Sequence, residues 1–240
     1  MIAKLPFSYR IRRSERVANA RIVVKPGLVE VVAPWQIPEH KLHNFVQAKQ
    51  QWIANALSKM AAVSPTQNGF VPTEFITGAT MVYQGTAYAL TILPSKLKRV
   101  KIEFCEGYKI YLPLSMNPVE HHEEIKTAII RWMKKQTKQL VEQVINIQGV
   151  KKQLYPRTIT IKTQKSRWGS CGIHNDISIN WLLIMAPKEV LEYVVVHELC
   201  HIKQKNHSSQ FWALVAYHLP DYQSRRNWLK KQGRRLMMAF

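Results

Sequence analysis

The first sixty residues alternate between apolar and polar positions and then change to a helical spacing. Period-two runs rich in Val and Ile predict strands at Phe7–Arg12, Ala20–Val24 and Leu28–Val32. Over Pro38–Met60, apolar residues recur every three or four positions, which predicts one long helix with its proline in the first turn. Residues 1–64 are therefore expected to form a β-rich N-terminal portion with one long helix.

A stretch rich in Pro, Gly, Ser and Asn follows at 65–78, and this composition is typical of a linker. After it, helical spacing over Val119–Ile147 predicts a second long helix, which Gly149 is expected to end. Between the linker and this helix, short apolar runs predict four strands, at Thr80–Tyr83, Ala87–Leu93, Val100–Phe104 and Lys109–Leu112.

The last third begins with two predicted strands, Arg157–Thr163 and Asp176–Asn180, separated by a turn at Ser166–Gly172. Gly169 and Gly172 are expected to give this turn its backbone freedom. Three helices follow, at about 187–204, 208–218 and 221–237. Strands and helices together predict an α+β fold with a C-terminal domain over 79–240; a single compact unit for the whole chain is the alternative.

Composition adds a strong positive charge to this picture. The 240 residues carry a net charge of +20, which attracts polyanions such as nucleic acid or nucleotides; an excess of Lys and Arg on an ordinary surface is the alternative. No zinc-finger, RNP or P-loop pattern turns the charge into a defined nucleic-acid module. No run of 18 apolar residues and no secretory signal is present, and the three cysteines are far apart. We expect a cytoplasmic protein without a membrane span.

The most specific chemical pattern lies in the helix expected at 187–204. His197-Glu198-Leu199-Cys200-His201 is an H-E-x-x-H sequence, which places both histidines on one face of a helix, one turn apart. Two imidazoles at this spacing can bind one zinc ion, with Glu198 as the general base beside it. The preceding residues are so apolar that the helix is expected to be buried, and buried polar groups need partners. Cys200 faces another side of the helix and is interpreted as a core thiol.

Three downstream residues are candidates for the third ligand: His207, His218 and Asp221. His207 is favoured because H-E-x-x-H followed six positions later by His is the ligand spacing of metzincins, although Gln204 replaces the glycine of that pattern. Asp221, like Ser208, is better interpreted as a helix N-cap. A structural zinc site is the alternative for the whole group, but such sites usually have four protein ligands.

A wider set of motifs resembles the YgjP-like metal-dependent hydrolases, relatives of the SprT-like and WLM zincins. The resemblance is carried by 196–201, Asn206-His207-Ser208 with Phe211-Trp212, Lys165–Cys171 and Ile177–Trp181. Weaker similarity at 9–14 and 29–34 extends it over nearly the whole chain.

The resemblance implies one zinc ion per chain, with His197, His201 and His207 as its ligands and Glu198 as the catalytic acid/base. It also implies a minimal zincin-like core, in which the H-E-x-x-H helix lies beside a small sheet. The family is associated with two activities, a metallopeptidase-like one and a nucleoside triphosphate (UTP) pyrophosphatase one. The primary hypothesis is therefore a zinc-dependent hydrolase of metallopeptidase type, and the UTP pyrophosphatase is the alternative.

Further residues are candidates for substrate binding. Arg167 could contact an anionic substrate, and Arg10, Arg12 and Arg13 could hold a polyphosphate if their strand folds over the metal site; structural or exposed charges are the alternatives. Trp168 is interpreted as a core residue. A peptidase would need an edge strand for its peptide, for which Asp176–Asn180 is the candidate. A third hypothesis is a nucleic-acid-associated binding protein with a structural zinc.

Overall fold

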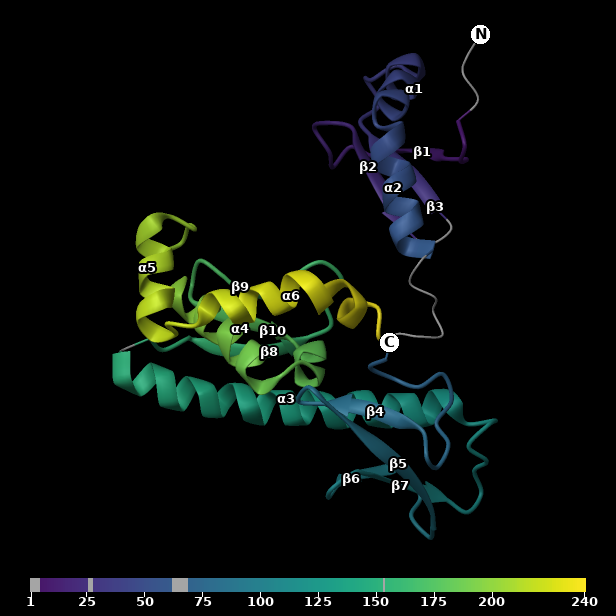
Figure 1. Ribbon diagram of the computed structural model, residues 1–240, viewed down its shortest axis with the longest axis vertical. Helices are drawn as coiled ribbons and strands as arrows, with labels where there is room; N and C mark the ends of the chain where they lie inside the picture. The colour runs from purple at the N-terminus through teal and green to yellow at the C-terminus, as the bar shows by residue number, and fades with distance from the viewer. Residues whose placement is uncertain (1–4, 26–27, 62–68, 153) are drawn as a thin grey trace. The chain divides into compact units, whose positions relative to one another are not determined.

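Residues 5–25, 28–61, 69–152 and 154–240 are described by the structure, a computed structural model (Figure 1). The chain divides into two units, Met1–Gln67 and Asn68–Phe240. Residues 65–68 of the expected linker lie outside the described residues. The rest of that stretch is not a linker, because Phe70 and Phe75 are buried in the second unit and the carbonyl of Phe70 accepts a hydrogen bond from Val82 N at 2.8 Å.

A central strand organises the N-terminal unit. Strand β3 (Leu28–Ala33) lies between β1 (Arg10–Arg13), which is parallel to it, and β2 (Arg21–Lys25), which is antiparallel. Its alternate residues pack against apolar side chains of the two helices α1 (Glu39–Ala48) and α2 (Gln50–Ala61). These buried residues are Val29, Val31, Ala33, Leu42, Val46 and Ile53.

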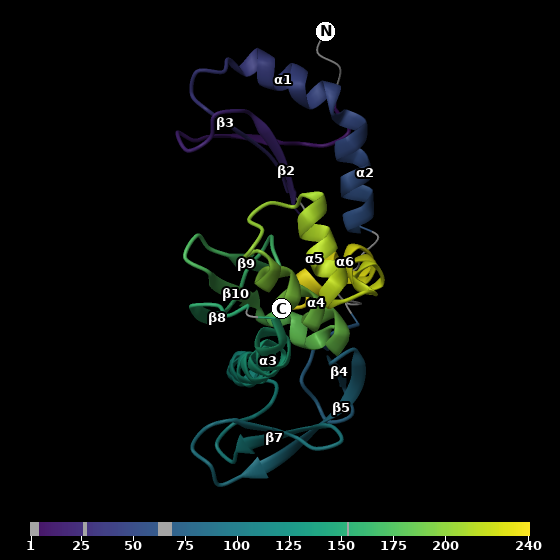
Figure 2. The same ribbon diagram turned by 90° about the vertical axis from the view of Figure 1, so that its left-hand side faces the viewer.

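The single helix predicted over Pro38–Met60 is wrong, because the backbone leaves the helical region at Lys49 (φ −105°, ψ 8°). Figure 2 shows α1 and α2 at an angle to each other. The bend lets Leu42 and Val46 from one helix and Ile53 from the other reach the same core. The apolar spacing continues across the bend, so the pattern alone does not reveal it.

The second unit begins with a four-stranded sheet in the order β4-β5-β7-β6. Its strands are β4 (Thr80–Tyr83), β5 (Thr86–Ser95), β6 (Lys101–Phe104) and β7 (Tyr108–Pro113). Gln84 and Gly85 form the two-residue turn between β4 and β5, both with positive φ (49° and 84°), as a tight hairpin requires. Their amides donate to the carbonyls of Ile184 at 2.8 Å and Met185 at 3.1 Å, so the hairpin tip is fixed to the segment that precedes the H-E-x-x-H helix.

A 31-residue helix, α3 (His122–Lys152), is the spine of this unit. Figures 1 and 2 show it between the β4–β7 sheet and the remaining elements, and it contacts β6 on one side and α4 on the other. Gly149 was predicted to end this helix but lies inside it. A Cβ at Gly149 would be 3.1 Å from the carbonyl oxygen of Leu154, so the glycine permits the close return of the chain.

The second sheet has the order β8-β10-β9, with β8 (Thr158–Lys162) parallel and β9 (Gly169–Cys171) antiparallel to β10 (Asp176–Asn180). Two predictions are corrected here. The residues expected as a turn at Ser166–Gly172 include strand β9, and Asp176–Asn180 is the central strand instead of an edge. An unpredicted 3-10 helix, Trp181–Met185, leads to the last three helices, α4 (Lys188–Cys200), α5 (Ser209–His218) and α6 (Tyr222–Met237).

Helices and sheets of both units make this an α+β fold, as predicted. No helix within the described parts of the chain combines the length and apolarity needed to cross a lipid bilayer.

Candidate metal centre

Helix α4 carries the H-E-x-x-H sequence through the middle of the second unit. It contacts α3, α5, α6, β9 and β10, and it is apolar nearly all round, as a buried helix must be. Pro187 precedes its first residue and Glu189 lies in its first turn, where a negative charge is favourable. His197, Glu198 and His201 are therefore presented from a scaffold fixed on several sides.

The end of α4 explains how the chain reaches His207. The helix was predicted to continue to 204 but ends at Cys200, after which Lys203 N and Gln204 N both donate to Cys200 O, at 3.1 and 3.0 Å. Gln204 does not have a positive φ, so this turn does not need the glycine of the metzincin pattern. Ser208 then caps α5, accepting a hydrogen bond from Phe211 N at 3.4 Å, as predicted.

Three imidazoles meet at this end of α4. The ligand atoms of His197, His201 and His207 all lie within 4.8 Å of one another, and the Nε2 atoms of His197 and His207 are 3.0 Å apart. His218 and Asp221 are not part of the group. His218 is buried on α5, and the Asp221 carboxylate accepts a hydrogen bond from Arg225 Nε at 2.9 Å. Asp221 occupies the N-cap position of α6, as predicted, although its side chain forms no capping hydrogen bond.

Electrostatics keeps two of these histidines neutral. Burial lowers the pKa of His197 to about 3, helped by the nearby His201, His207 and Arg226. Burial also lowers the pKa of His201, whose Nδ1 lies 2.9 Å from the carbonyl oxygen of Gln204. An N–H at Nδ1 would donate to this carbonyl and leave the Nε2 lone pair of His201 directed at the other histidines.

Two aromatic residues of α5 hold the imidazoles in place. The Phe211 ring stacks on His201, with centroids 4.4 Å apart, and lies 4.8 Å from both His197 and His207. Trp212 lies 5.7 Å from the His207 ring. The sequence places these aromatics three and four residues after Ser208, which predicts their helix but not their contact with all three histidines.

Glu198 is buried beside the histidines, with only 6% of its surface exposed. Burial raises its pKa to about 7, and the positive charge of Arg167 opposes this shift. Among the described residues, none donates a hydrogen bond to the Glu198 carboxylate. A carboxyl group with a pKa near neutral pH can both accept and release a proton, as a general base and acid must.

Gly169 of β9 makes room for Glu198. A Cβ at Gly169 would lie 2.6 Å from Glu198 Oε1 and 2.7 Å from its Cγ, closer than real Cβ atoms approach. By contrast, a Cβ at Gly172 would make only ordinary contacts, the nearest at 3.7 Å. The expectation that Gly169 serves a turn is wrong, because it lies in β9 and is needed for close packing. Gly172 does begin the turn between β9 and β10, where its carbonyl accepts a hydrogen bond from Asn175 N at 3.1 Å, but without a positive φ.

The donor set suits a zinc-like ion. Neutral imidazole nitrogens are preferred ligands of zinc. Whether the histidines are free to bind an ion depends on the hydrogen-bond partners of their ring nitrogens. His197 Nδ1 is buried and has no hydrogen-bond partner in the described parts of the protein, and its Nε2 faces another imidazole nitrogen at 3.0 Å. A cation bound by the two Nε2 atoms would use the lone pairs that otherwise face each other, with the proton of His197 on Nδ1, so the residues present fit the group.

The expected arginines belong to different units of the chain. Arg167 precedes β9 and acts electrostatically on Glu198. Arg10 and Arg12 belong to the N-terminal unit, where both bind the buried carboxylate of Glu30, at 2.9 and 3.1 Å. In the same unit, Arg13 donates to the carbonyls of Pro34 and Ile37 at 2.9 and 2.6 Å. The structure thus brings one of the four to the histidine group, and the other three have partners within their own unit.

The fold and the site together define an α+β protein of the metal-dependent hydrolase class. A family model described as YgjP-like, metallopeptidase domain, matches residues 18–232, so the chain belongs to the YgjP-like metallopeptidase family. Among solved structures, the metallopeptidase zymogen of Pyrococcus abyssi abylysin is similar, with 22% identity and a TM-score of 0.34 over 41% of this chain and 96% of that chain. No curated protein matches the chain.

Proposed function

We propose that the protein is a zinc-dependent metallopeptidase in which His197, His201 and His207 bind one zinc ion per chain and Glu198 is the catalytic acid/base. The observation that carries this proposal is the convergence of three imidazoles beside a buried carboxyl group whose pKa is about 7. We further propose that α4 and the β8–β10 sheet are a minimal zincin core. Free thiols at Cys105 and Cys171 support the expected cytoplasmic location.

When bound, zinc would supply Lewis acidity toward water and toward the scissile carbonyl group. Glu198 accepts a proton from the attacking water on one carboxylate oxygen and delivers it to the amine nitrogen as the C–N bond breaks. Its burial favours this role, because the protonated form is stable near neutral pH. Gly169 allows the carboxylate to lie against β9 during both transfers.

Strand β9 is the candidate site for an extended peptide. It is an outer strand of its sheet and contacts α4. Trp168 O and Gly172 N are bonded to β10, at 2.8 and 2.9 Å, and the alternation of an antiparallel ladder directs the backbone groups of Gly169 and Cys171 to the opposite edge. A peptide added there would run beside Glu198.

Zinc content and peptide cleavage test the proposal together. The full chain should bind one zinc ion, measured by elemental analysis after dialysis, and should cleave an unfolded protein into fragments detected by mass spectrometry. His207→Ala should lose most of the zinc and the cleavage. Glu198→Gln should keep the zinc and lose the cleavage, because it removes only the proton acceptor.

His174→Ala is the matched control, since His174 is exposed in the turn between β9 and β10 of the same unit. Its zinc content and cleavage should equal those of the unchanged chain. Loss of zinc in Glu198→Gln would make Glu198 a ligand and contradict its role as acid/base. Zinc bound with no cleavage in any protein would favour the structural-zinc hypothesis.

The UTP pyrophosphatase and nucleic-acid-binding hypotheses each have a direct test. A UTP pyrophosphatase remains the alternative, but it can no longer rely on Arg10, Arg12 and Arg13, which have partners in the N-terminal unit. Pyrophosphate release from nucleoside triphosphates by the zinc-loaded chain is its direct assay. Nucleic-acid binding remains a prediction from the net charge of +20, and a salt titration tests it.

A further inference from the structure

A pocket of about 360 Å³ opens beside the candidate catalytic residues. Glu198 and His197 line one part of it, and Trp168, Tyr193 and Leu229 give it apolar walls. Its volume lies in the range of pockets that hold small ligands. Because the pocket includes Glu198, any group bound in it would lie next to the bond that is broken.

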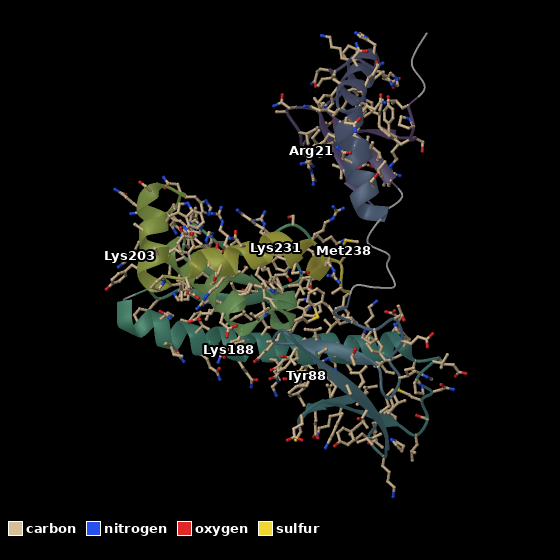
Figure 3. The ribbon with its side chains drawn as sticks, viewed as in Figure 1. Arg21, Tyr88, Lys188, Lys203, Lys231 and Met238 are labelled. Atoms are coloured by element: carbon tan, nitrogen blue, oxygen red, sulfur yellow. The ribbon has the colours of Figure 1, made fainter. Side chains whose placement is uncertain are left out.

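Two cations of α6 complete the lining of this pocket, Arg226 and Lys230. They are four residues apart and therefore lie on one face of the helix. In the described parts of the chain, neither forms an ion pair with an acidic side chain. Lys231, the next residue, is exposed but does not line the pocket (Figure 3).

Arg225, the residue before Arg226, does have acidic partners. Arg225 binds the carboxylates of Glu192 and Asp221, at 2.7 and 2.9 Å, so acidic residues are present on this side of the fold. Arg226 instead lies with its guanidinium 4.4 Å from the centre of the Trp212 ring, which restricts its position. A positioned cation without a protein anion, at the wall of a pocket, is suited to an anion that the substrate brings.

The charges around the pocket also limit the kind of anion. Among the described residues that line the pocket, Glu198 is the one acidic residue, and it shares the lining with the two cations. A single carboxylate can pair with Arg226 and Lys230 while its stem packs on Trp168 or Leu229. A triphosphate would bring more negative charges than Arg226 and Lys230 can pair, and the excess would lie next to Glu198, which disfavours it relative to a single carboxylate.

We propose that this pocket binds a carboxylate of the peptide substrate through Arg226 and Lys230, so that cleavage is directed to bonds next to an acidic group. The inference rests on the proposed peptidase function and adds its substrate class. The carboxylate has two sources in peptides, an Asp or Glu side chain and the C-terminus.

Paired peptides measure this preference directly. Each pair differs only by Glu or Gln at one position, and each is made with a free and with an amidated C-terminus. Competition between the two members in one tube gives the ratio of their kcat/KM values, which should favour Glu about tenfold, as expected for a hydrogen-bonded charge. With an amidated C-terminus, a difference between the Glu and Gln peptides comes from the side-chain carboxylate. Between Gln peptides with a free and an amidated C-terminus, a difference comes from the terminal carboxylate.

Substitution of the cations should remove the preference. Arg226→Gln and Lys230→Gln should each lower the ratio toward one, whereas Lys231→Gln should keep it. The double substitution Arg226→Glu with Lys230→Glu should reverse the preference, so that a Lys peptide is cleaved faster than its Glu counterpart. A misfolded protein cannot produce such a reversal.

Binding to zinc-loaded Glu198→Gln, measured by calorimetry, separates this inference from the proposed activity. Glu peptides should bind about tenfold more tightly than Gln peptides even when nothing is cleaved. Selective binding without cleavage by the unchanged chain would support the pocket and contradict the peptidase. Cleavage of both peptides at equal rates would overturn the pocket assignment and leave the peptidase. Pyrophosphate release from UTP that depends on Arg226 would overturn it in favour of a nucleotide.

Discussion

Two buried glutamates, one in each unit, have opposite surroundings. Glu30 of the N-terminal unit is 4% exposed and Glu198 of the second unit is 6% exposed. Arg10 and Arg12 both donate to Glu30, and hydrogen bonds and charge from these arginines lower its pKa. No residue in the described parts of the chain donates to Glu198 in this way, and burial raises its pKa to about 7.

This difference separates a structural carboxylate from a reactive one. Burial alone disfavours a negative charge, and hydrogen-bond donors decide whether the charge is nevertheless kept. Glu30 is held ionised and ties β1 to β3, whereas Glu198 is held ready to exchange a proton. The same residue type at the same exposure therefore acquires its role from its neighbours.

Exchanging each carboxylate for an amide gives the largest expected contrast. Glu198→Gln should lower kcat for peptide cleavage by about 10²–10⁴-fold, the usual contribution of general acid–base catalysis. Glu30→Gln should leave kcat unchanged, because Glu30 supports only the N-terminal sheet. Steady-state kinetics of the two zinc-loaded variants checks this; equal losses in both would remove the distinction between the glutamates.

A methyl group next to Glu198 should have the next largest effect. Gly169→Ala places a Cβ where the Glu198 carboxylate lies, so the carboxylate must move, and kcat should fall by about 10²-fold with zinc retained. Gly172→Ala is the matched control, because its Cβ finds ordinary space, and its kcat should not change. Unchanged kinetics in Gly169→Ala would show that the position of Glu198 is not critical.

Stability should respond to pH in opposite directions at the two sites. The pKa of Glu198 is raised from 4.5 to about 7, so the folded zinc-free protein binds more protons than the unfolded chain in this range. Its stabilising contribution is present below pH 4.5 and is lost as the pH rises through 7. Zinc-free Glu198→Gln should therefore be more stable at pH 8, by up to roughly 3 kcal/mol, and equal near pH 4.5.

Glu30 has a lowered pKa, so its contribution is present at neutral pH and is lost as the pH falls through its folded value. Glu30→Gln should therefore destabilise the protein at neutral pH. Denaturant melts of both variants at pH 4.5 and 8 measure the two effects. A less stable Glu198→Gln at pH 8 would contradict the proposed cost of burying this charge.

The smallest effect is expected at a partly exposed carboxylate, that of Asp176. Asp176 receives hydrogen bonds from Arg157 at 2.8 Å and Thr158 at 2.7 Å, which with the charge of Arg157 lower its pKa to about 2. Its contribution is present above pH 3.8 and is lost as the pH falls through about 2. Asp176→Asn should therefore lower the midpoint of thermal unfolding slightly at pH 5 and not at pH 2, by circular dichroism.

The sequence predicts what depends on near neighbours along the chain. The spacing of His197, Glu198 and His201 is local, because any α-helix places these positions together, and the cap at Ser208 depends on three residues. The family resemblance is also local in its motifs, and the match over residues 18–232 confirms it.

Features that depend on distant contacts could not be predicted. The space that Gly169 leaves for Glu198 arises from the packing of β9 on α4. Arg225 and Arg226 are adjacent and chemically identical, but only the fold shows that the first has Glu192 as a partner and the second faces a pocket. Likewise, the sequence alone suggests that Arg10 and Arg12 could bind phosphate, and only the fold shows that both bind the carboxylate of Glu30.

The turn at Gln84-Gly85 has a consequence for how this protein can be modified. Hairpin tips usually tolerate inserted residues, because they lie on the surface and contact little. Here both amides are bonded to the backbone of the 3-10 helix, and a Cβ at Gly85 would be 3.0 Å from Pro187, the residue before α4. An epitope tag or a circular permutation at this tip would disturb the start of the histidine-bearing helix, so engineers should place such changes elsewhere.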